Sequence, residues 1–489
     1  MLKQLHTMDS LFLYIENDEY QVDLTPVFFY DPAGANAAGL TTEQLLGQFR
    51  KTVDAVPALR SRLERVPFDL DNPYLAEDRN FRLEDHFSEV ELPAPGDWEA
   101  LRTLLTDFQN RQLDTNRPLW EVLIVRGLDK VEDMPKGAFA MAMKIHHVIA
   151  DGHTVIEILS KLHDEGQVQE GEQEPRVEFK APTYYDRLGQ VFSNNLLGAL
   201  GMMNPLLNTL PRLSKTLLET ISKDSDKLMR PPVTTRFNRK ANNKELAWNF
   251  ASLDFATAKR ISKLESGATI NDVVLTVIAG AMREYMQSKG DSTNDCLRAL
   301  APVNVRQESE RYAGGNEVSF IMPDLPVQIA DARERLQAVM LSTGHNKKIA
   351  KDLDSREMSG LMKSVPPALM ASMRLMGVIE NTTQPLLKLI GNALATNVPG
   401  PGSELHLHGA RLINMTGVIS PNEGLGLHHV IVSYAGKLNI SVTAKRDTLP
   451  DPEFYRDCLQ RSFEQLLAAY PAAPAPAAAE TASPAAAAA

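Results

Sequence analysis

The sequence predicts an α/β fold built from two subdomains. The chain has 489 residues, its first third alternates helix and strand patterns, and a polar stretch broken by Arg230-Pro231-Pro232 divides it near the middle. Single hydrophobic cores rarely grow beyond about 250 to 300 residues, so a chain of this length is expected to split. We place an N-terminal subdomain at residues 1–164, a linker with apolar helices at 165–240 and a C-terminal subdomain at 241–470.

The N-terminal subdomain is predicted to lead into two adjacent histidines. Apolar residues at helical spacing predict helices, and short apolar runs predict strands. In chain order, the predicted elements are a helix that opens at a capping box over 41–44, a helix over 98–113, strands over 120–125 and 137–145, and a helix from 154. His146 and His147 therefore lie at a junction between a strand and a helix.

The second half shows the same mixture of patterns. The predicted elements are a helix over 271–287, strands over 297–305, 317–321, 405–413 and 429–434, and a final helix after Asp451-Pro452, where proline suits the first helical turn. The Ala/Pro composition of residues 471–489 predicts a disordered tail.

Composition excludes several functional classes. The net charge of −11 argues against nucleic-acid binding, because phosphates require a basic face. Cys296 and Cys458 provide neither a disulfide framework nor a cysteine metal site, and such low cysteine usage suits a reducing compartment. No run approaches the roughly 20 apolar residues of a membrane-spanning helix. We therefore expect a cytoplasmic protein.

The segment His146-His147-Val148-Ile149-Ala150-Asp151-Gly152 carries the candidate chemistry. Adjacent side chains of an extended segment point to opposite sides, so the two histidines are not expected to share a metal. A neutral imidazole can take a proton from a hydroxyl, because its reference pKa lies near working pH, and we predict His147 as a general base. Asp151 would either orient an imidazole or pair with a cation elsewhere, and Gly152 permits a close backbone approach. A turn with purely structural histidines is the alternative.

This segment resembles the HHxxxDG signature of the coenzyme A-dependent acyltransferase superfamily. From about residue 5 to 468, the chain is similar to the bacterial wax ester synthase/diacylglycerol acyltransferase family. The motifs that carry the similarity are MDSLF at 8–12, RPLWE at 117–121, TINDVVL at 269–275, PVNVR at 302–306, GNEVS at 315–319, NVPGP at 397–401 and SYAG at 433–436. The sequence departs from the family pattern at 21–24, where a histidine-bearing segment is common, and at Asn304, where Ser is commoner. We expect the first departure to affect acyl-chain or lipid preference, and neither to affect the catalytic base.

The resemblance implies two chloramphenicol-acetyltransferase-like subdomains with a tunnel between them and His147 near its middle. Acyl-CoA would be the co-substrate and a fatty alcohol or diacylglycerol the acceptor, with no permanently bound cofactor and no metal. His147 would deprotonate the acceptor hydroxyl, which would attack the thioester without an acyl-enzyme. Asn271 is the candidate oxyanion donor, with capping of its helix as the alternative role. The resemblance also implies a structural ion pair between Asp151 and Arg306.

Three functions compete at this point. They are an acyltransferase that forms wax esters or triacylglycerol, a related condensation enzyme that uses a carrier-protein thioester, and a non-catalytic lipid-binding protein. The match of seven motifs favours the first over the second, and the intact His147 and Asp151 favour both enzymes over the third. The apolar product implies peripheral association with a membrane or lipid inclusion. The preferred acceptor, the acyl length and the oligomeric state stay open.

Overall fold

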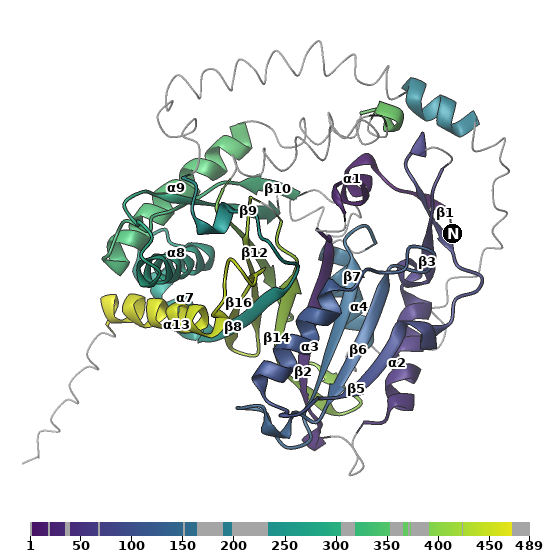
Figure 1. The fold of residues 1–489 in the computed structure, drawn as a ribbon, viewed down its shortest axis with the longest axis horizontal. Coiled ribbons are helices and arrows are strands. Elements are labelled where there is room, and N and C mark those ends of the chain that lie inside the picture. Colours follow the sequence, from purple (N-terminus) through teal and green to yellow (C-terminus); the bar gives the residue numbers. More distant parts are fainter. Residues whose placement is uncertain are drawn as a thin grey trace, which may run out of the picture.

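The computed structural model describes residues 2–17, 20–34, 40–66, 69–149, 152–163, 189–197, 233–304, 318–352, 365–369, 372, 391–422 and 424–471. Two large β-sheets dominate these residues, and helices cover both (Figure 1). A smaller sheet joins β1 (Leu2–Gln4), β4 (Tyr74–Glu77) and β3 (Ser61–Glu64). The predicted mixed α/β class is confirmed.

The first sheet has the strand order β13-β14-β2-β7-β6-β5. The strands are β2 (Asp23–Asp31), β5 (Phe87–Glu91), β6 (Trp120–Arg126), β7 (Phe139–His146), β13 (His406–Leu407) and β14 (Ala410–Ile419). All neighbours are antiparallel except β5 and β6. The strands predicted over 120–125 and 137–145 are confirmed as β6 and β7.

Helices cover both faces of the first sheet because its buried residues alternate. Phe28 and Tyr30 of β2 belong to the core under α2 (Thr42–Ala55) and α4 (Gly152–Leu162). Val27 and Phe29 belong to the opposite core, under α3 (Trp98–Asn110). This alternation with a period of two is the expected consequence of a pleated strand. The predicted capping box of α2 is confirmed, since the Thr41 side chain and Gln44 satisfy each other's backbone N–H groups.

The second sheet has the strand order β10-β9-β12-β15-β16-β8, with β11 also paired to β9. Its strands are β8 (Leu246–Asp254), β9 (Leu297–Asn304), β10 (Val318–Ile321), β11 (Asp324–Leu325), β12 (Ala393–Pro399), β15 (Leu427–Tyr434) and β16 (Lys437–Lys445). Helices gather on one side of it, as Figure 1 shows: α7 (Phe255–Leu264), α8 (Ile270–Ser288), α9 (Ala332–Asp352) and α13 (Pro452–Ala469).

Strand β14 connects the two sheets. It pairs with β2 along its length, although it lies between β12 and β15 in the chain, which both belong to the second sheet. Gly417 of β14 accepts hydrogen bonds from Trp248 Nε1 at 3.0 Å and from Ser441 Oγ at 2.9 Å, both from the second sheet. Residues 406–419 therefore complete the first sheet, whereas the sequence division assigns them to the C-terminal subdomain. The boundaries at 164/165 and 240/241 stay a prediction.

The predicted strand over 405–413 is divided in the structure by a tight turn. His408 and Gly409 both adopt positive φ, at 47° and 81°, and they join β13 to β14 as a hairpin. β14 then continues to Ile419 because its inner positions stay buried.

None of the helices in the described part of the chain is long and apolar enough to cross a membrane.

Candidate functional site

A tight backbone turn carries His146 and His147 out of strand β7. The His146 N–H donates to the Leu119 carbonyl of the neighbouring segment at 3.0 Å, so the first histidine still belongs to the sheet. The Ile149 N–H donates to the His146 carbonyl at 3.1 Å and closes the turn. His147 is the first residue beyond the strand, and α4 begins at Gly152. The predicted junction between strand and helix is therefore confirmed.

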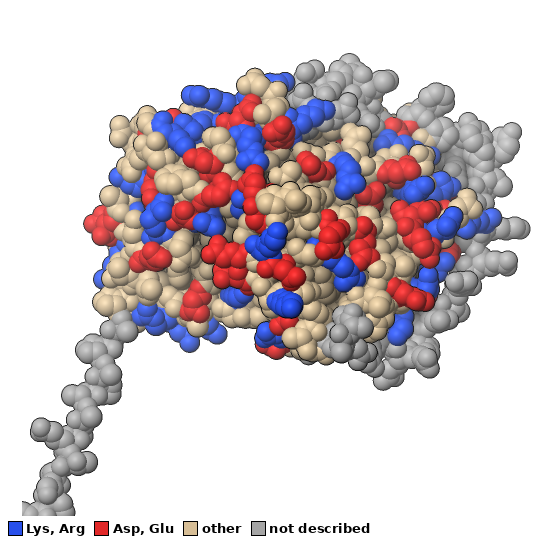
Figure 2. Space-filling view, turned by 60° about the horizontal axis from the view of Figure 1, so that its bottom comes forward, with Lys and Arg blue, Asp and Glu red and all other residues tan. Residues whose placement is uncertain are grey.

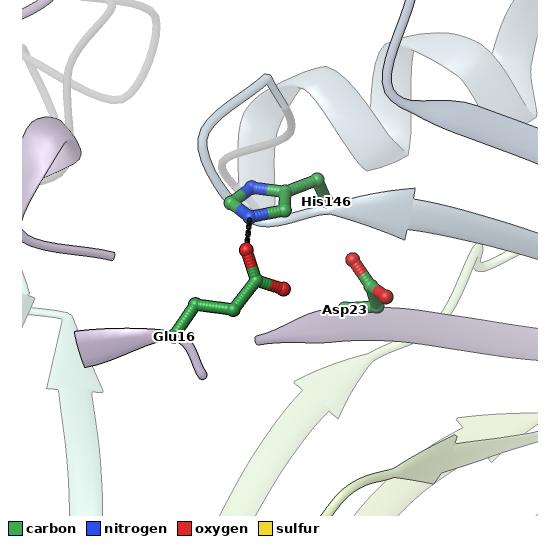
Figure 3. Close-up of side chains that lie close together, drawn as sticks. All are labelled: Glu16, Asp23 and His146. Carbon is green, nitrogen blue, oxygen red and sulfur yellow. Dashed lines mark hydrogen bonds and ion pairs between the residues drawn. The ribbon is translucent and has the colours of Figure 1, made fainter. Parts of the chain in front are cut away.

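The His146 ring is fixed on both nitrogens. Its Nδ1 lies 3.0 Å from the Val148 backbone N–H and must accept that proton. Its Nε2 lies 3.2 Å from Glu16 Oε2, and Figure 3 shows the two side chains pointing toward each other. A neutral imidazole carries one proton, so only the tautomer protonated at Nε2 satisfies both contacts. His146 is 2% exposed and already fully engaged, which makes it a structural histidine.

His147 has different surroundings from its neighbour. Its side chain is half-buried, and its ring stacks on Phe12 with a centroid distance of 4.1 Å and an interplanar angle of 18°. Phe12 lies in α1 (Thr7–Ile15), within the MDSLF motif, so the opening segment packs directly on the predicted base. Sequence reasoning singled out this motif for its similarity but did not predict the contact.

A buried ion pair lies beside the turn. Lys144 Nζ is 3.2 Å from Asp23 Oδ2, and both side chains are 1% exposed. Lys144 also donates to the Gln109 carbonyl at 2.9 Å and to the Arg111 carbonyl. Burial raises the pKa of Asp23 and lowers the pKa of Lys144, although each charge favours the ionised form of the other. Burial therefore disfavours both charged forms, and the ion pair opposes this effect.

Asp23 belongs to the segment at 21–24 that departs from the family pattern. It lies directly opposite His146 in the pairing of β2 with β7, and Lys144 is two residues before His146 on the same face of β7. This segment therefore lies beside the catalytic turn, next to His146, and the expectation that its departure leaves the base His147 unaffected stays a prediction. A strand register that pairs residues 23 and 146 cannot be read from their separation in the sequence.

Among the described residues, Glu16, Asp23 and His146 form a group whose ligand-type atoms lie within 4.8 Å of one another. Their chemistry does not fit a divalent cation. Lys144 already supplies the positive charge beside Asp23, and a metal on His146 Nε2 would place the ring proton on Nδ1, against the Val148 N–H. The group is better described as a hydrogen-bonded charge cluster.

The other residues that the sequence singles out have different outcomes in the structure. Asn271 is the second residue of α8 and is partly buried, but Thr269 caps this helix through Asp272, so the alternative capping role of Asn271 is wrong. Asp151 and Arg306 lie outside the described residues, and their ion pair stays a prediction. The segment around Trp120 belongs to the core, because its indole is fully buried and donates to the Leu59 carbonyl at 2.7 Å.

A second pair of adjacent histidines, His428-His429, lies in β15, where the sequence predicts a strand over 429–434. Burial lowers the pKa of His428 to about 3 and that of His429 to about 4. His429 Nε2 lies 2.9 Å from the Tyr455 hydroxyl within the helix-covered core of the second sheet. These side chains are neutral structural histidines at physiological pH.

Comparisons with known proteins identify the family of this chain. The model of the wax ester synthase/diacylglycerol acyltransferase catalytic domain matches residues 5–274, and that of the family's C-terminal domain matches 314–467. A putative diacylglycerol O-acyltransferase from Mycobacterium tuberculosis is 27% identical over 95% of this chain and 91% of its own length.

Solved structures show the same fold. The wax ester synthase/diacylglycerol acyltransferase from Marinobacter aquaeolei VT8 has a TM-score of 0.64 at 23% identity and covers 95% of this chain and 98% of its own. A trichothecene 15-O-acetyltransferase from Fusarium sporotrichioides has a TM-score of 0.57 at 11% identity, with 95% of each chain covered. The predicted fold, related to that of chloramphenicol acetyltransferase, is therefore confirmed. The chain belongs to the wax ester synthase/diacylglycerol acyltransferase family and is an acyltransferase.

Proposed function

We propose that this enzyme transfers a long-chain acyl group from acyl-CoA to the hydroxyl of a fatty alcohol or diacylglycerol, with His147 as the general base. The observation that carries the proposal is the contrast between the two histidines. His146 has both ring nitrogens engaged, whereas the half-buried His147 lies beyond the strand on a turn fixed by backbone hydrogen bonds. An imidazole held in this way is suited to proton transfer.

The proposed reaction transfers the acyl group directly to the acceptor by addition and elimination, without an acyl-enzyme. His147 takes the acceptor's hydroxyl proton as the oxygen attacks the thioester carbonyl, which forms the new C–O bond and a tetrahedral oxyanion. The oxyanion collapses, the C–S bond breaks, and the leaving thiolate receives the proton held by the imidazolium. Asn271 is the proposed donor to the oxyanion. One preorganised donor commonly contributes about 3 kcal/mol to such a step. Access through a tunnel between the subdomains is part of this proposal.

The purified protein should release free coenzyme A from palmitoyl-CoA when an acceptor is added. Hexadecanol and dioleoylglycerol should be offered separately, with thiol release and ester product both measured. Product with either acceptor supports the proposal and assigns the preference. Thiol release that is the same with and without acceptor would indicate hydrolysis and contradict it.

We also propose a cytoplasmic protein that associates peripherally with lipid. Helical residues 189–197 support this, because two asparagines face the protein body while three large apolar side chains are exposed. Asn194 donates to Gln4 Oε1 at 3.0 Å and to Asp71 Oδ2 at 2.8 Å, and Asn195 donates to the Leu70 carbonyl at 2.9 Å. The asparagines thus hold the helix to the protein body.

The exposed side of this helix carries three large apolar side chains beside the uncharged Gln190 and Ser193. Phe192, Leu196 and Leu197 are 72%, 49% and 62% exposed, and the segment GQVFSNNLL contains no charged residue. Leu70 and Leu369 add exposed apolar surface beside this helix. The Leu70 carbonyl accepts a hydrogen bond from Asn195, and the N–H of Ala368, the neighbour of Leu369, donates to the Asn195 side chain. An uncharged patch of this kind suits a lipid surface.

Replacing Phe192 and Leu196 together by aspartate should weaken binding to phospholipid vesicles. Two large apolar side chains at an interface contribute about 3 kcal/mol together, so binding should fall roughly 100-fold in a flotation assay. Leu341→Asp is the matched control, because Leu341 is 77% exposed on α9. Equal vesicle binding by the double variant and the control would exclude residues 189–197 as the lipid-binding surface.

The charges on the face shown in Figure 2 are consistent with a substrate other than nucleic acid. Figure 2 shows Lys and Arg interspersed with Asp and Glu over the face in view, without a continuous basic area. Nucleic-acid-binding proteins present such an area as their electrostatic footprint.

A further inference from the structure

We propose that Glu16 is a positioning residue for the catalytic turn: it selects the tautomer of His146, and His146 in turn holds the backbone from which His147 projects. This inference deepens the proposed function and rests on the role of His147 as the base. Glu16 lies 130 residues before His146 and belongs to none of the sequence motifs that carry the family resemblance.

The first step of the argument is the direction of the hydrogen bonds. A carboxylate only accepts, so the contact of 3.2 Å from His146 Nε2 to Glu16 requires the ring proton to be on Nε2. This leaves Nδ1 as an acceptor for the Val148 N–H at 3.0 Å. If the proton moved to Nδ1, two donors would face each other at Val148. Glu16 therefore stabilises the one tautomer that is compatible with the turn.

The second step is that His146 has little access to an alternative partner. It is 2% exposed, and its own backbone is bound on both sides, to the Leu119 carbonyl and the Ile149 N–H. A buried backbone N–H without an acceptor is unfavourable, so losing the Nδ1 acceptor should displace Val148. His147 lies between His146 and Val148 and would move with them.

The third step is that one short segment contacts both histidines. Phe12 of α1 stacks on the His147 ring at 4.1 Å, and Glu16 directly follows the last residue of α1. Leu13, between them, is 4% exposed and packs in the core of the first subdomain. The helix is thus anchored, and its two functional contacts are coupled through a fixed backbone. The opening segment thus fixes the position of the catalytic turn through these two contacts.

The charge of Glu16 is less important than its acceptor oxygen in this account. Its side chain is 26% exposed, which leaves its charge partly screened by water, and the fully buried charge of Asp23 is already matched by Lys144. Glutamine keeps the acceptor and the length of the side chain, whereas methionine keeps only the length. The two substitutions therefore separate hydrogen bonding from charge.

Glu16→Met should lower kcat about 10- to 100-fold and leave KM for palmitoyl-CoA within about twofold, because misplacement of a reacting group by about 1 Å can cost this much. Glu16→Gln should retain kcat within about threefold of the parent. Glu43→Met, which removes an exposed carboxylate in the first turn of α2, is the matched control and should behave like the parent. Thermal unfolding of each variant verifies that the protein is folded.

A double-mutant cycle identifies the route of the effect. His146→Asn places an amide oxygen near the position of Nδ1 but does not reach Glu16. In that background Glu16→Met should change kcat by less than about twofold, because the contact that it removes is already absent. If the effects of the two substitutions multiply, Glu16 acts by another route and the proposal is wrong. The same conclusion follows if Glu16→Met keeps the parent's kcat, or if Glu16→Gln is as slow as Glu16→Met.

A second readout does not depend on catalysis. In protein labelled with ¹⁵N-histidine, the ring nitrogen shifts of His146 should report protonation at Nε2 in the parent and in Glu16→Gln. Glu16→Met should show the other tautomer or a mixture. An unchanged Nε2–H signal in Glu16→Met would overturn the proposal even if no acyl transfer is detected, whereas an inactive parent with the expected tautomer shift would refute only the proposed function.

Discussion

Replacing His147 by alanine is expected to abolish ester formation from palmitoyl-CoA. A general base is typically worth a factor of about 100 to 10,000 in rate, and the neighbouring His146 cannot take over, because both of its ring nitrogens are engaged. The His147 side chain is half-buried and lies beyond the end of β7, so its removal should leave the fold intact. Initial rates of thiol release, together with thermal unfolding, check this result.

Two further variants make the test specific. His146→Ala should reduce turnover less than His147→Ala, because it disturbs the turn without removing the base. Phe12→Leu keeps an apolar contact against the His147 ring but removes the stacked aromatic partner, and it should retain most of the activity. Near-normal turnover by a folded His147→Ala variant would show that His147 is not the base.

The location of this base could be predicted from the sequence because the information is local. The apolar run that becomes β7 ends at His146, and the apolar periodicity of α4 resumes a few residues later. Alternation along a strand correctly indicated that His146 and His147 do not share surroundings. Both features can be recognised from the residues that immediately precede and follow the two histidines.

The partners of the two histidines could not be predicted, because they come from distant segments. Glu16 and Asp23 approach His146 through the docking of α1 and the register of β2 against β7. Lys144 gave a weak signal, since a lysine within the apolar strand FAMAMKIH requires a buried acidic partner. The identity of that partner depends on strand pairing, which no periodicity reveals.

Strand β14 illustrates the same limit at the level of the fold. Its alternating apolar residues predicted a strand, but not the sheet to which it belongs. Consecutive strands usually neighbour each other, and β14 instead crosses from between β12 and β15 to the edge of β2. Its hydrogen bonds with Trp248 and Asn439 join the sheets through side chains that the sequence alone gives no reason to pair.

Replacing Lys144 by methionine should destabilise the protein by about 3 to 5 kcal/mol, the usual cost of leaving one charge of a buried ion pair without its partner. Lys144 and Asp23 are each 1% exposed, so water does not compensate. The variant also loses the hydrogen bond of 2.9 Å to the Gln109 carbonyl. Urea unfolding followed by tryptophan fluorescence measures the change. Arg50→Met is the control, because the Arg50–Glu84 pair is exposed and should contribute less than about 1 kcal/mol.

The loss caused by Lys144→Met should become smaller as the pH falls. Burial already raises the pKa of Asp23, and removing the lysine charge that opposes this shift should raise it further. A group whose pKa is higher in the folded than in the unfolded state stabilises the fold at low pH, and this contribution is lost as the pH rises through the folded pKa. The variant should therefore be closest to the parent in acid. Combining it with Asp23→Leu should cost less than the sum of the single changes, because no charge is then left buried. Strict additivity, or a loss as small as that of Arg50→Met, would mean that the pair is not a coupled, buried unit in solution.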